Sequence, residues 1–341
     1  MTESVDELVR RAGLRAALPA RHVAGLILTY RCSIRCRHCL FCCSPSAPSA
    51  VMTVEQAVEA ILQLRALGRV VHIAGGEALL YPHIVTEAAR EAHRRGQPAH
   101  FVETNAFWAV NDEFVRRRLE ELKDAGLAGL LISADIFHQE FVPAENFLRA
   151  RRIAREVFGP RNVLASDQPD EQILDLARRA GRDDQLAAEA TAAGVRLVGR
   201  AAGLARYFPL RPIAQLADDP LWYGANDGMP CRREFDPQSM WEIHIDPYGN
   251  IQTCCGVLLG RLGDGPVARQ AAAGWPGNPL VKTLIEQGPV GLLPLAQAHG
   301  YQPKEAYPQK CCLCYHLRHF LHPRFPDLLG PAEVYSEPPA E

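Results

Sequence analysis

The sequence predicts an α/β fold with a parallel sheet, followed by a smaller, irregular region. Between Val23 and Arg200, short apolar runs alternate with helical patterns. Such alternation indicates parallel strands, because each parallel pairing needs a long crossover that is usually a helix. After about Gly203 the alternation stops and the sequence becomes richer in proline. The six apolar runs interpreted as strands are Val23–Thr29, Val70–Ala74, Ala99–Glu103, Ala128–Ser133, Asn162–Ala165 and Val195–Val198.

The helix between the first two predicted strands has clear signals at both ends. Thr53 and Gln56 form a capping box at its start, and Gly68 supplies the stop at its end. The next two helices end in the same way, at Gly96 and Gly126. Periodicity alone does not distinguish an open sheet from part of a barrel. In both cases the chemistry is expected at the carboxyl ends of the strands, where the loops converge.

The later region contains one predicted hairpin. Apolar residues alternate with polar ones from Trp241 to Ile245, a turn follows at 246–250, and the returning strand Ile251–Thr253 leads to Cys254. The rest of this region is too poor in regular structure to fold without a metal or cluster that holds it together.

Composition excludes several classes of protein. With 48% hydrophobic residues in 341, the chain can bury a sizeable core, and intrinsic disorder is excluded as its main state. A net charge of −2 disfavours a nucleic-acid or membrane-surface partner. No stretch approaches the roughly 18 uninterrupted apolar residues of a membrane span, and the N-terminus lacks the features of a signal peptide. We therefore expect a cytoplasmic protein.

The cysteines are more informative than the overall composition. Eleven in 341 residues are too sparse for a disulfide scaffold. They are clustered rather than scattered, which favours metal or iron–sulfur ligation. The groups are Cys32, Cys36, Cys39, Cys42 and Cys43; Cys231; Cys254 and Cys255; and Cys311, Cys312 and Cys314.

The first three cysteines form a CxxxCxxC motif directly after the first strand. Cys32, Cys36 and Cys39 can hold three irons of a 4Fe-4S cube and leave the fourth iron open to a substrate or cofactor. A zinc knuckle or a fortuitous group of thiols is the alternative. The motif resembles that of the radical S-adenosylmethionine (SAM) superfamily. The resemblance implies a partial (β/α)6 TIM barrel over residues 21–203, after an N-terminal helical segment at 1–20.

A second motif, Gly75-Gly76-Glu77, follows the second strand. Glycines let the backbone approach a ligand closely, and a carboxylate accepts hydrogen bonds from an ammonium group. In the radical SAM family the corresponding sequence holds the methionyl amino group of SAM, which assigns that role to Glu77. Ala78 replaces the proline that commonly follows. Taken alone, the motif is compatible with a structural turn.

The third and fourth strands end in Thr104-Asn105-Ala106 and Ser133-Ala134-Asp135. These resemble family sequences that contact the ribose and methionyl parts of SAM, although Ala106 replaces the usual glycine. Asn105 or Ser133 can equally satisfy a backbone group at a strand end. Arg200 is a candidate for the SAM carboxylate or an ordinary surface arginine.

A polar and aromatic loop follows Asp135. His138 and Glu140 lie on it as candidates to position substrate or transfer protons. The alternative is a solvated loop before a helix.

A second set of cysteines fits a closed cluster. One ligand on a hairpin and a distant CxxC can complete four ligands and enclose a whole cube. The pattern resembles the SPASM and twitch extensions of radical SAM enzymes and implies an auxiliary domain over 204–330, with a loose tail at 331–341. Six cysteines in this region, rather than the seven of a full SPASM pattern, favour one auxiliary 4Fe-4S cluster. A four-cysteine zinc site is the alternative. The predicted ligands are Cys231, Cys254, Cys311 and Cys314, and Cys42, Cys43, Cys255 and Cys312 are expected to be bystanders.

The resemblance implies an oxidoreductase-type activity. Such an enzyme cleaves SAM reductively to a 5′-deoxyadenosyl radical, which abstracts a substrate hydrogen in oxidation or cross-linking of a small molecule or a ribosomal peptide. It needs an electron donor such as flavodoxin or ferredoxin. The alternative from another class is a non-enzymatic iron–sulfur or zinc carrier or sensor. Glu77, Asn105 and Ser133 discriminate between the two, because a carrier needs no SAM pocket.

Overall fold

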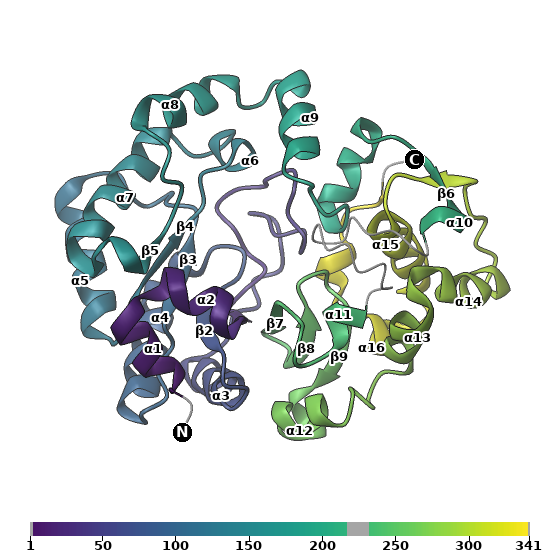
Figure 1. Cartoon of the computed structure of the whole chain (residues 1–341), viewed down its shortest axis with the longest axis horizontal. Coiled ribbons are helices and arrows are strands. Elements are labelled where there is room, and N and C mark those ends of the chain that lie inside the picture. The colour runs from purple at the N-terminus through teal and green to yellow at the C-terminus, as the bar shows by residue number, and fades with distance from the viewer. Residues whose placement is uncertain (1–2, 217–231, 340–341) are drawn as a thin grey trace. The chain divides into compact units, whose positions relative to one another are not determined.

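The computed structural model describes residues 3–216 and 232–339, which form two compact units (Figure 1). The first unit extends to Cys36 and also contains Ser44–Gln185 and Glu242–Pro247. The second contains Arg37–Cys43 and the remaining described residues from Leu186 onward. Cys231 lies outside the described residues.

Six strands of the first unit form a parallel sheet. Their order is β5-β4-β3-β2-β1-β7, and every neighbouring pair is parallel. The first five lie where the sequence predicts strands, which confirms the α/β class with a mostly parallel sheet of the partial-barrel kind. The bounds are β1 Val23–Ile27, β2 Val70–Ala74, β3 Phe101–Thr104, β4 Gly129–Ile132, β5 Val163–Leu164 and β7 Glu242–Ile245.

The predicted sixth strand at Val195–Val198 is wrong. The backbone of this segment forms hydrogen bonds with a glutamine side chain instead of a neighbouring strand. Gln309 accepts from Leu197 N at 3.2 Å and donates to Val195 O at 3.1 Å. The 3-10 helix η3 (Gly199–Tyr207) follows. The sixth parallel strand is β7, which the sequence predicts only as one arm of a hairpin.

Helices alternate with these strands. The capping box of α3 is confirmed: Gln56 N donates to Thr53 Oγ1 at 3.2 Å, and Thr53 N donates to Gln56 Oε1 at 2.9 Å. The bounds are α1 Val5–Ala12, α2 Leu14–Arg21, α3 Val54–Arg65, η1 Ala78–Leu80, α4 Pro82–Arg94, α5 Asp112–Asp124, α6 Ile136–Gln139, α7 Ala144–Phe158, η2 Pro160–Asn162 and α8 Asp170–Arg179, with α9 Asp183–Ala192 across the unit boundary.

The two N-terminal helices pack against the first ends of the strands. Leu8, Leu14 and Ala17 share a buried cluster with Val23 of β1 and Phe101 of β3. Such burial of apolar side chains is the main force that holds these helices on the sheet.

The second unit is built from short elements. β8 (Asn250–Thr253) pairs antiparallel with β9 (Leu258–Arg261), and β6 (Arg211–Pro212) pairs antiparallel with β10 (Ala306–Tyr307). Its helices are α10 Ile213–Leu216, α11 Arg232–Phe235, η5 Leu262–Asp264, α12 Val267–Ala272, α13 Pro279–Gln287, η6 Gly288–Leu292, α14 Leu293–Ala298, α15 Lys310–Leu321, α16 Pro326–Leu329 and η7 Ala332–Tyr335.

Residues 331–339 differ from the loose tail expected from their sequence. Val334 of η7 is fully buried, and Tyr335 stacks on Tyr315 of α15 with ring centroids 6.0 Å apart. Apolar and aromatic contacts thus hold the segment. No helix among the described residues is long and apolar enough to span a membrane.

Candidate active site

The Gly75-Gly76-Glu77 segment lies directly against the chain that leads from β1 to Cys32. Gly76 N donates to Thr29 O at 2.7 Å, and Glu77 N donates to Arg31 O at 2.9 Å. A Cβ at Gly76 would lie 2.1 Å from Arg31 O, and Gly75 has φ +144°. Only glycine fits at these two positions, so the motif fixes where Glu77 lies.

Glu77 is buried, and three donors surround its carboxylate. Oε1 accepts from Leu79 N at 3.0 Å and from Thr104 Oγ1 at 2.9 Å, and Oε2 accepts from Asn105 N at 2.8 Å. Burial raises the pKa of Glu77 to about 7, although the hydrogen bonds favour the charged form. The side chain is therefore fixed in place and suited to pair with a cation.

The turn after β3 keeps a glycine-like conformation without a glycine. Ala106 has φ +62°, in the left-handed region that L-residues rarely adopt. Ala106 N and Trp108 Nε1 donate to Thr104 Oγ1 at 3.1 and 2.9 Å, and these bonds hold the turn. The replacement of the usual glycine thus leaves the turn intact.

Asn105 joins the carboxylate to the cysteine loop. Its backbone N–H bonds Glu77, and its Nδ2 lies 3.6 Å from Cys32 Sγ and 3.0 Å from Ser33 Oγ. Cys32 and Cys36 are both buried. An amide donor at a thiolate sulfur is the kind of contact that supports an iron–sulfur ligand, so these residues fit a cluster.

Cys39 lies in the second unit. Its Sγ accepts from Cys43 N at 3.3 Å, and its carbonyl accepts from Arg200 N at 2.9 Å. Arg200 Nη2 donates to the carbonyls of Cys42 and Cys43 at 2.9 and 3.0 Å, and Nε donates to Glu337 at 3.1 Å. The guanidinium therefore steadies this loop, which sequence reasoning did not foresee. A role for Arg200 at the SAM carboxylate stays a prediction.

Residues after β4 serve local structure in the first unit. Asp135 caps α6 by accepting from Phe137 N at 3.0 Å and His138 N at 3.1 Å, and it also contacts His138 Nδ1 at 2.8 Å. Ser133 N donates to Thr104 O at 3.0 Å. Glu140 is the C-cap of the same short helix.

All four predicted bystander cysteines, Cys42, Cys43, Cys255 and Cys312, are buried. Burial raises the pKa of Cys42 to about 11 and that of Cys312 to about 12, and it also raises the pKa of Cys255. A neutral thiol is a poor metal ligand, because the thiolate is the form that binds. These environments favour a bystander role.

The predicted auxiliary ligands lie in the second unit. Cys311 and Cys314 are buried in the first turns of α15, three residues apart and on one face, and partly exposed Cys254 follows β8. Arg318 contacts the Cys314 thiol and donates to the carbonyls of Cys255 and Gly256 at 2.9 and 2.8 Å.

Arg318 thus ties α15 to the chain after Cys254. Sequence reasoning missed this residue, although its position four residues after Cys314 on the same helix was a usable signal.

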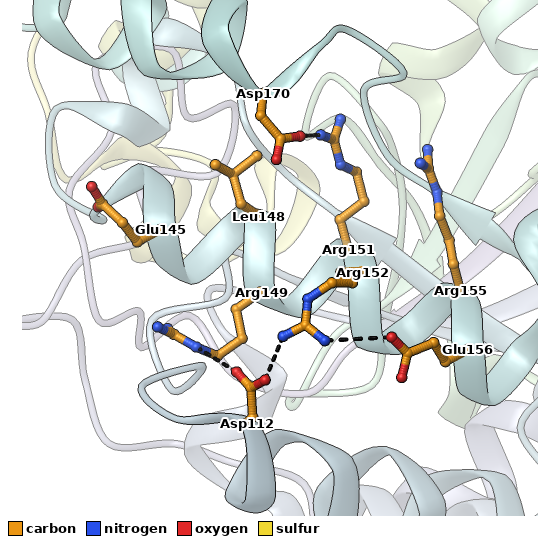
Figure 2. Close-up of a pocket in the computed structure, with 9 residues that line it drawn as sticks. All are labelled: Asp112, Glu145, Leu148, Arg149, Arg151, Arg152, Arg155, Glu156 and Asp170. Atoms are coloured by element: carbon orange, nitrogen blue, oxygen red, sulfur yellow. Dashed lines mark hydrogen bonds and ion pairs between the residues drawn. The ribbon is translucent and has the colours of Figure 1, made fainter.

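A surface pocket of the first unit contains none of the predicted site residues. Figure 2 shows Arg149, Arg151 and Arg152 paired with carboxylates, with Arg149 at 3.1 Å from Asp112 and Arg151 at 2.6 Å from Asp170. Most of its charges pair with one another, and Arg155 pairs with Asp167 beside it, which is typical of a solvated outer face.

Residues 26–182 match the family described as the radical SAM superfamily. Two similar solved structures are BtrN in complex with AdoMet and 2-DOIA and native anSMEcpe with bound AdoMet and Cp18Cys peptide. BtrN is 13% identical with a TM-score of 0.43, covering 79% of this chain and 89% of that chain. AnSMEcpe is 10% identical with a TM-score of 0.39, covering 90% and 97%. No curated protein sequence matches the chain.

Proposed function

Because residues 26–182 match the radical SAM superfamily, we propose that the chain belongs to it, cleaves SAM reductively and abstracts a hydrogen atom from a substrate. The observation that best supports this is the double role of Asn105. Its backbone bonds buried Glu77 and its side chain contacts Cys32. Asn105 thus holds both Glu77, the carboxylate proposed to bind the ammonium group, and Cys32, a proposed cluster ligand. A cluster carrier does not need this arrangement.

The proposed ligands of the SAM-binding 4Fe-4S cluster are Cys32, Cys36 and Cys39. When bound, the cluster supplies the electron that breaks the sulfonium–carbon bond of SAM. Asn105 Nδ2 and Cys43 N donate to the sulfurs of Cys32 and Cys39, and such donors stabilise thiolate charge.

The SAM pocket is proposed to be built mainly on the strand ends of the first unit. The Glu77 carboxylate accepts hydrogen bonds from the ammonium group of SAM, and Gly75 and Gly76 allow the backbone to approach SAM closely. Asn105, Ser133 and Asp135 are assigned to the ribose and methionyl parts of SAM. His138, oriented by its contact with Asp135, and Glu140 are the candidates nearer the substrate.

We further propose that Cys231, Cys254, Cys311 and Cys314 hold one auxiliary 4Fe-4S cluster in a twitch-like domain. Cys311 and Cys314 lie on one face at the start of α15, and Arg318 ties this helix to the chain after Cys254. An auxiliary cluster gives the substrate electron a place to go after hydrogen abstraction. The proposed outcome is oxidation or cross-linking of a small molecule or a ribosomal peptide, with flavodoxin or ferredoxin as electron donor.

The decisive experiment is SAM cleavage by the full chain. Anaerobically reconstituted protein with dithionite and SAM should form 5′-deoxyadenosine, detected by liquid chromatography and mass spectrometry. Cys36→Ala should abolish it. Cys312→Ala removes a buried, neutral thiol and should retain it. Protein that carries zinc at both cysteine sets and leaves SAM intact would support the carrier alternative instead.

Iron counting tests the auxiliary cluster separately. Reconstituted protein should contain about eight irons per chain, two cubes of four, and Cys314→Ala should fall to about four. Cleavage of SAM should continue in that variant. About four irons in both proteins would exclude the auxiliary cluster.

A further inference from the structure

Two histidines and a glutamate meet across three neighbouring strands of the first unit. Gly25 of β1 is in register with His72 of β2 on one side and with His244 of β7 on the other. Glu242 is two residues before His244 and therefore on the same face of the sheet. One ligand atom from each of His72, Glu242 and His244 lies within 4.8 Å of the others.

Gly25 makes this meeting possible. A Cβ at this position would lie 2.2 Å from His72 Nε2 and 2.9 Å from His244 Cδ2. Its φ is not in the left-handed region, so backbone conformation does not explain the glycine. Glycine inside a strand weakens the strand. At this position the absence of a side chain leaves the space in which the two imidazole rings approach each other.

The contacts are close but not directed as ordinary hydrogen bonds. His72 Nε2 and His244 Nε2 lie 2.8 and 3.2 Å from Glu242 Oε1, and His72 Nδ1 lies 3.1 Å from Glu103 Oε1. Neither ring nitrogen of His72 forms a hydrogen bond of good geometry, although the ring is fully buried. Nitrogen and oxygen atoms that lie close together without aligned hydrogen bonds are expected where all of them coordinate one central ion.

Charge also favours a cation at this point. Glu103 and Glu242 bring two negative charges to two largely buried imidazole rings. The Glu242 side chain is 15% exposed, and negative charge at such a site is costly unless it is paired, whereas Glu103 is 34% exposed and adds a second charge nearby. A dication balances both carboxylates and leaves the imidazoles neutral, which is the form in which histidine binds a metal.

We propose that His72, Glu242 and His244 bind a divalent transition-metal ion, with Zn²⁺ as the ion that this ligand set suits best. Two histidines and one carboxylate form a three-ligand zinc set that leaves a fourth position open. The negative charge of Glu103 Oε1, 3.1 Å from Nδ1, favours the form of His72 that carries its proton on Nδ1, which leaves Nε2 for the metal. Phe101 stacks on the His72 ring at 4.9 Å and restrains it.

Zinc content and coordination of the full chain test the proposal without reference to SAM cleavage. Anaerobically reconstituted protein is incubated with Zn²⁺, desalted, and measured by elemental mass spectrometry and zinc X-ray absorption. We expect one zinc per chain with nitrogen and oxygen ligands at about 2.0–2.1 Å, distinct from zinc bound by cysteine at about 2.3 Å. His244→Ala should lose this zinc, and His83→Ala, which changes an exposed histidine of α4, should keep it.

Further variants keep the test valid if His244→Ala fails to fold. Glu242→Gln preserves shape and should lose the zinc, and Glu103→Gln should weaken zinc affinity by about 10–100-fold without changing the stoichiometry. Gly25→Ala should exclude the zinc while all ligands remain. Zinc content unchanged in Glu242→Gln, a shell made only of sulfur, or no retained zinc in the wild type would overturn the proposal and leave a buried charge network.

Discussion

The proposed pairing of Glu77 with SAM predicts a defined pH dependence of SAM binding. Its pKa is raised by burial to about 7, so at pH 6 the carboxyl is mostly protonated and a poor partner for an ammonium group. Ionisation between pH 6 and 7.5 should strengthen SAM binding by about 8-fold. Calorimetric titration at both values measures this, and Glu77→Gln should bind weakly with a flat profile. An equal slope in the variant would assign the pH dependence to another group.

Without SAM, the same residue affects stability in the opposite direction. A carboxyl whose folded pKa exceeds its unfolded value stabilises the fold below about pH 4.5 and loses that contribution as pH rises through about 7. SAM should therefore raise the melting temperature more at pH 7.5 than at pH 6.

Ala106 is the residue whose backbone conformation constrains substitution most directly. Because φ is +62°, a β-branched side chain is strained there, and the site is also fully buried. We expect Ala106→Val to lose about 2–3 kcal/mol of unfolding free energy, and Ala106→Gly to stay within about 1 kcal/mol of wild type. Chemical denaturation of both variants measures the difference. Equal stability of the two would show that the turn relaxes.

At the scale of elements, the segment before η1 depends on Gly76. A methyl group there would meet the carbonyl of Arg31 at 2.1 Å, and a backbone atom cannot move aside as a side chain can. Gly76→Ala should cost about 1–3 kcal/mol and displace Glu77, with weaker SAM binding as the result. Gly203→Ala is the matched control, since a Cβ at Gly203 meets nothing within 4 Å. Similar losses in both variants would refute the close approach.

Local signals predicted most elements of the first unit. The capping box of Thr53 and Gln56 and the run Val70–Ala74 needed only neighbouring residues, and both are confirmed. Val195–Val198 is as apolar as the run Val70–Ala74, but its backbone groups form hydrogen bonds with Gln309, which is distant in the sequence. Alternation at β7 predicted a strand, yet it carries no information about pairing with β1.

The candidate site also has some parts that local sequence patterns predict and others that only the structure reveals. The cysteine spacing and Gly-Gly-Glu are contiguous patterns, so the sequence alone is enough to propose them as site residues. The link from Asn105 to Cys32 and the bonds from Arg318 to the carbonyls of Cys255 and Gly256 depend on tertiary contacts. Gly25 gave no local signal, because its importance comes from the side chains in register with it on two other strands.

For the whole molecule, the first unit depends on a segment far along the sequence. Tyr30 donates to Asp246 at 3.0 Å, both residues are buried, and β7 covers the free edge of β1. A fragment of residues 1–185 lacks this strand and should aggregate, because an uncovered apolar edge strand pairs with other copies. Size-exclusion chromatography beside the full chain tests this, and a monodisperse, folded fragment would contradict it.

The late position of β7 also sets an order in time during synthesis. Glu242 is translated 57 residues after Gln185, a delay of roughly 3–11 s at ordinary elongation rates. During that interval β1 has β2 on one side and no strand of its own unit on the other. Until its last parallel strand emerges, the nascent chain must therefore avoid pairing of the Val23–Ile27 edge with other chains. This interval is the stage of synthesis at which the protein is most exposed to aggregation.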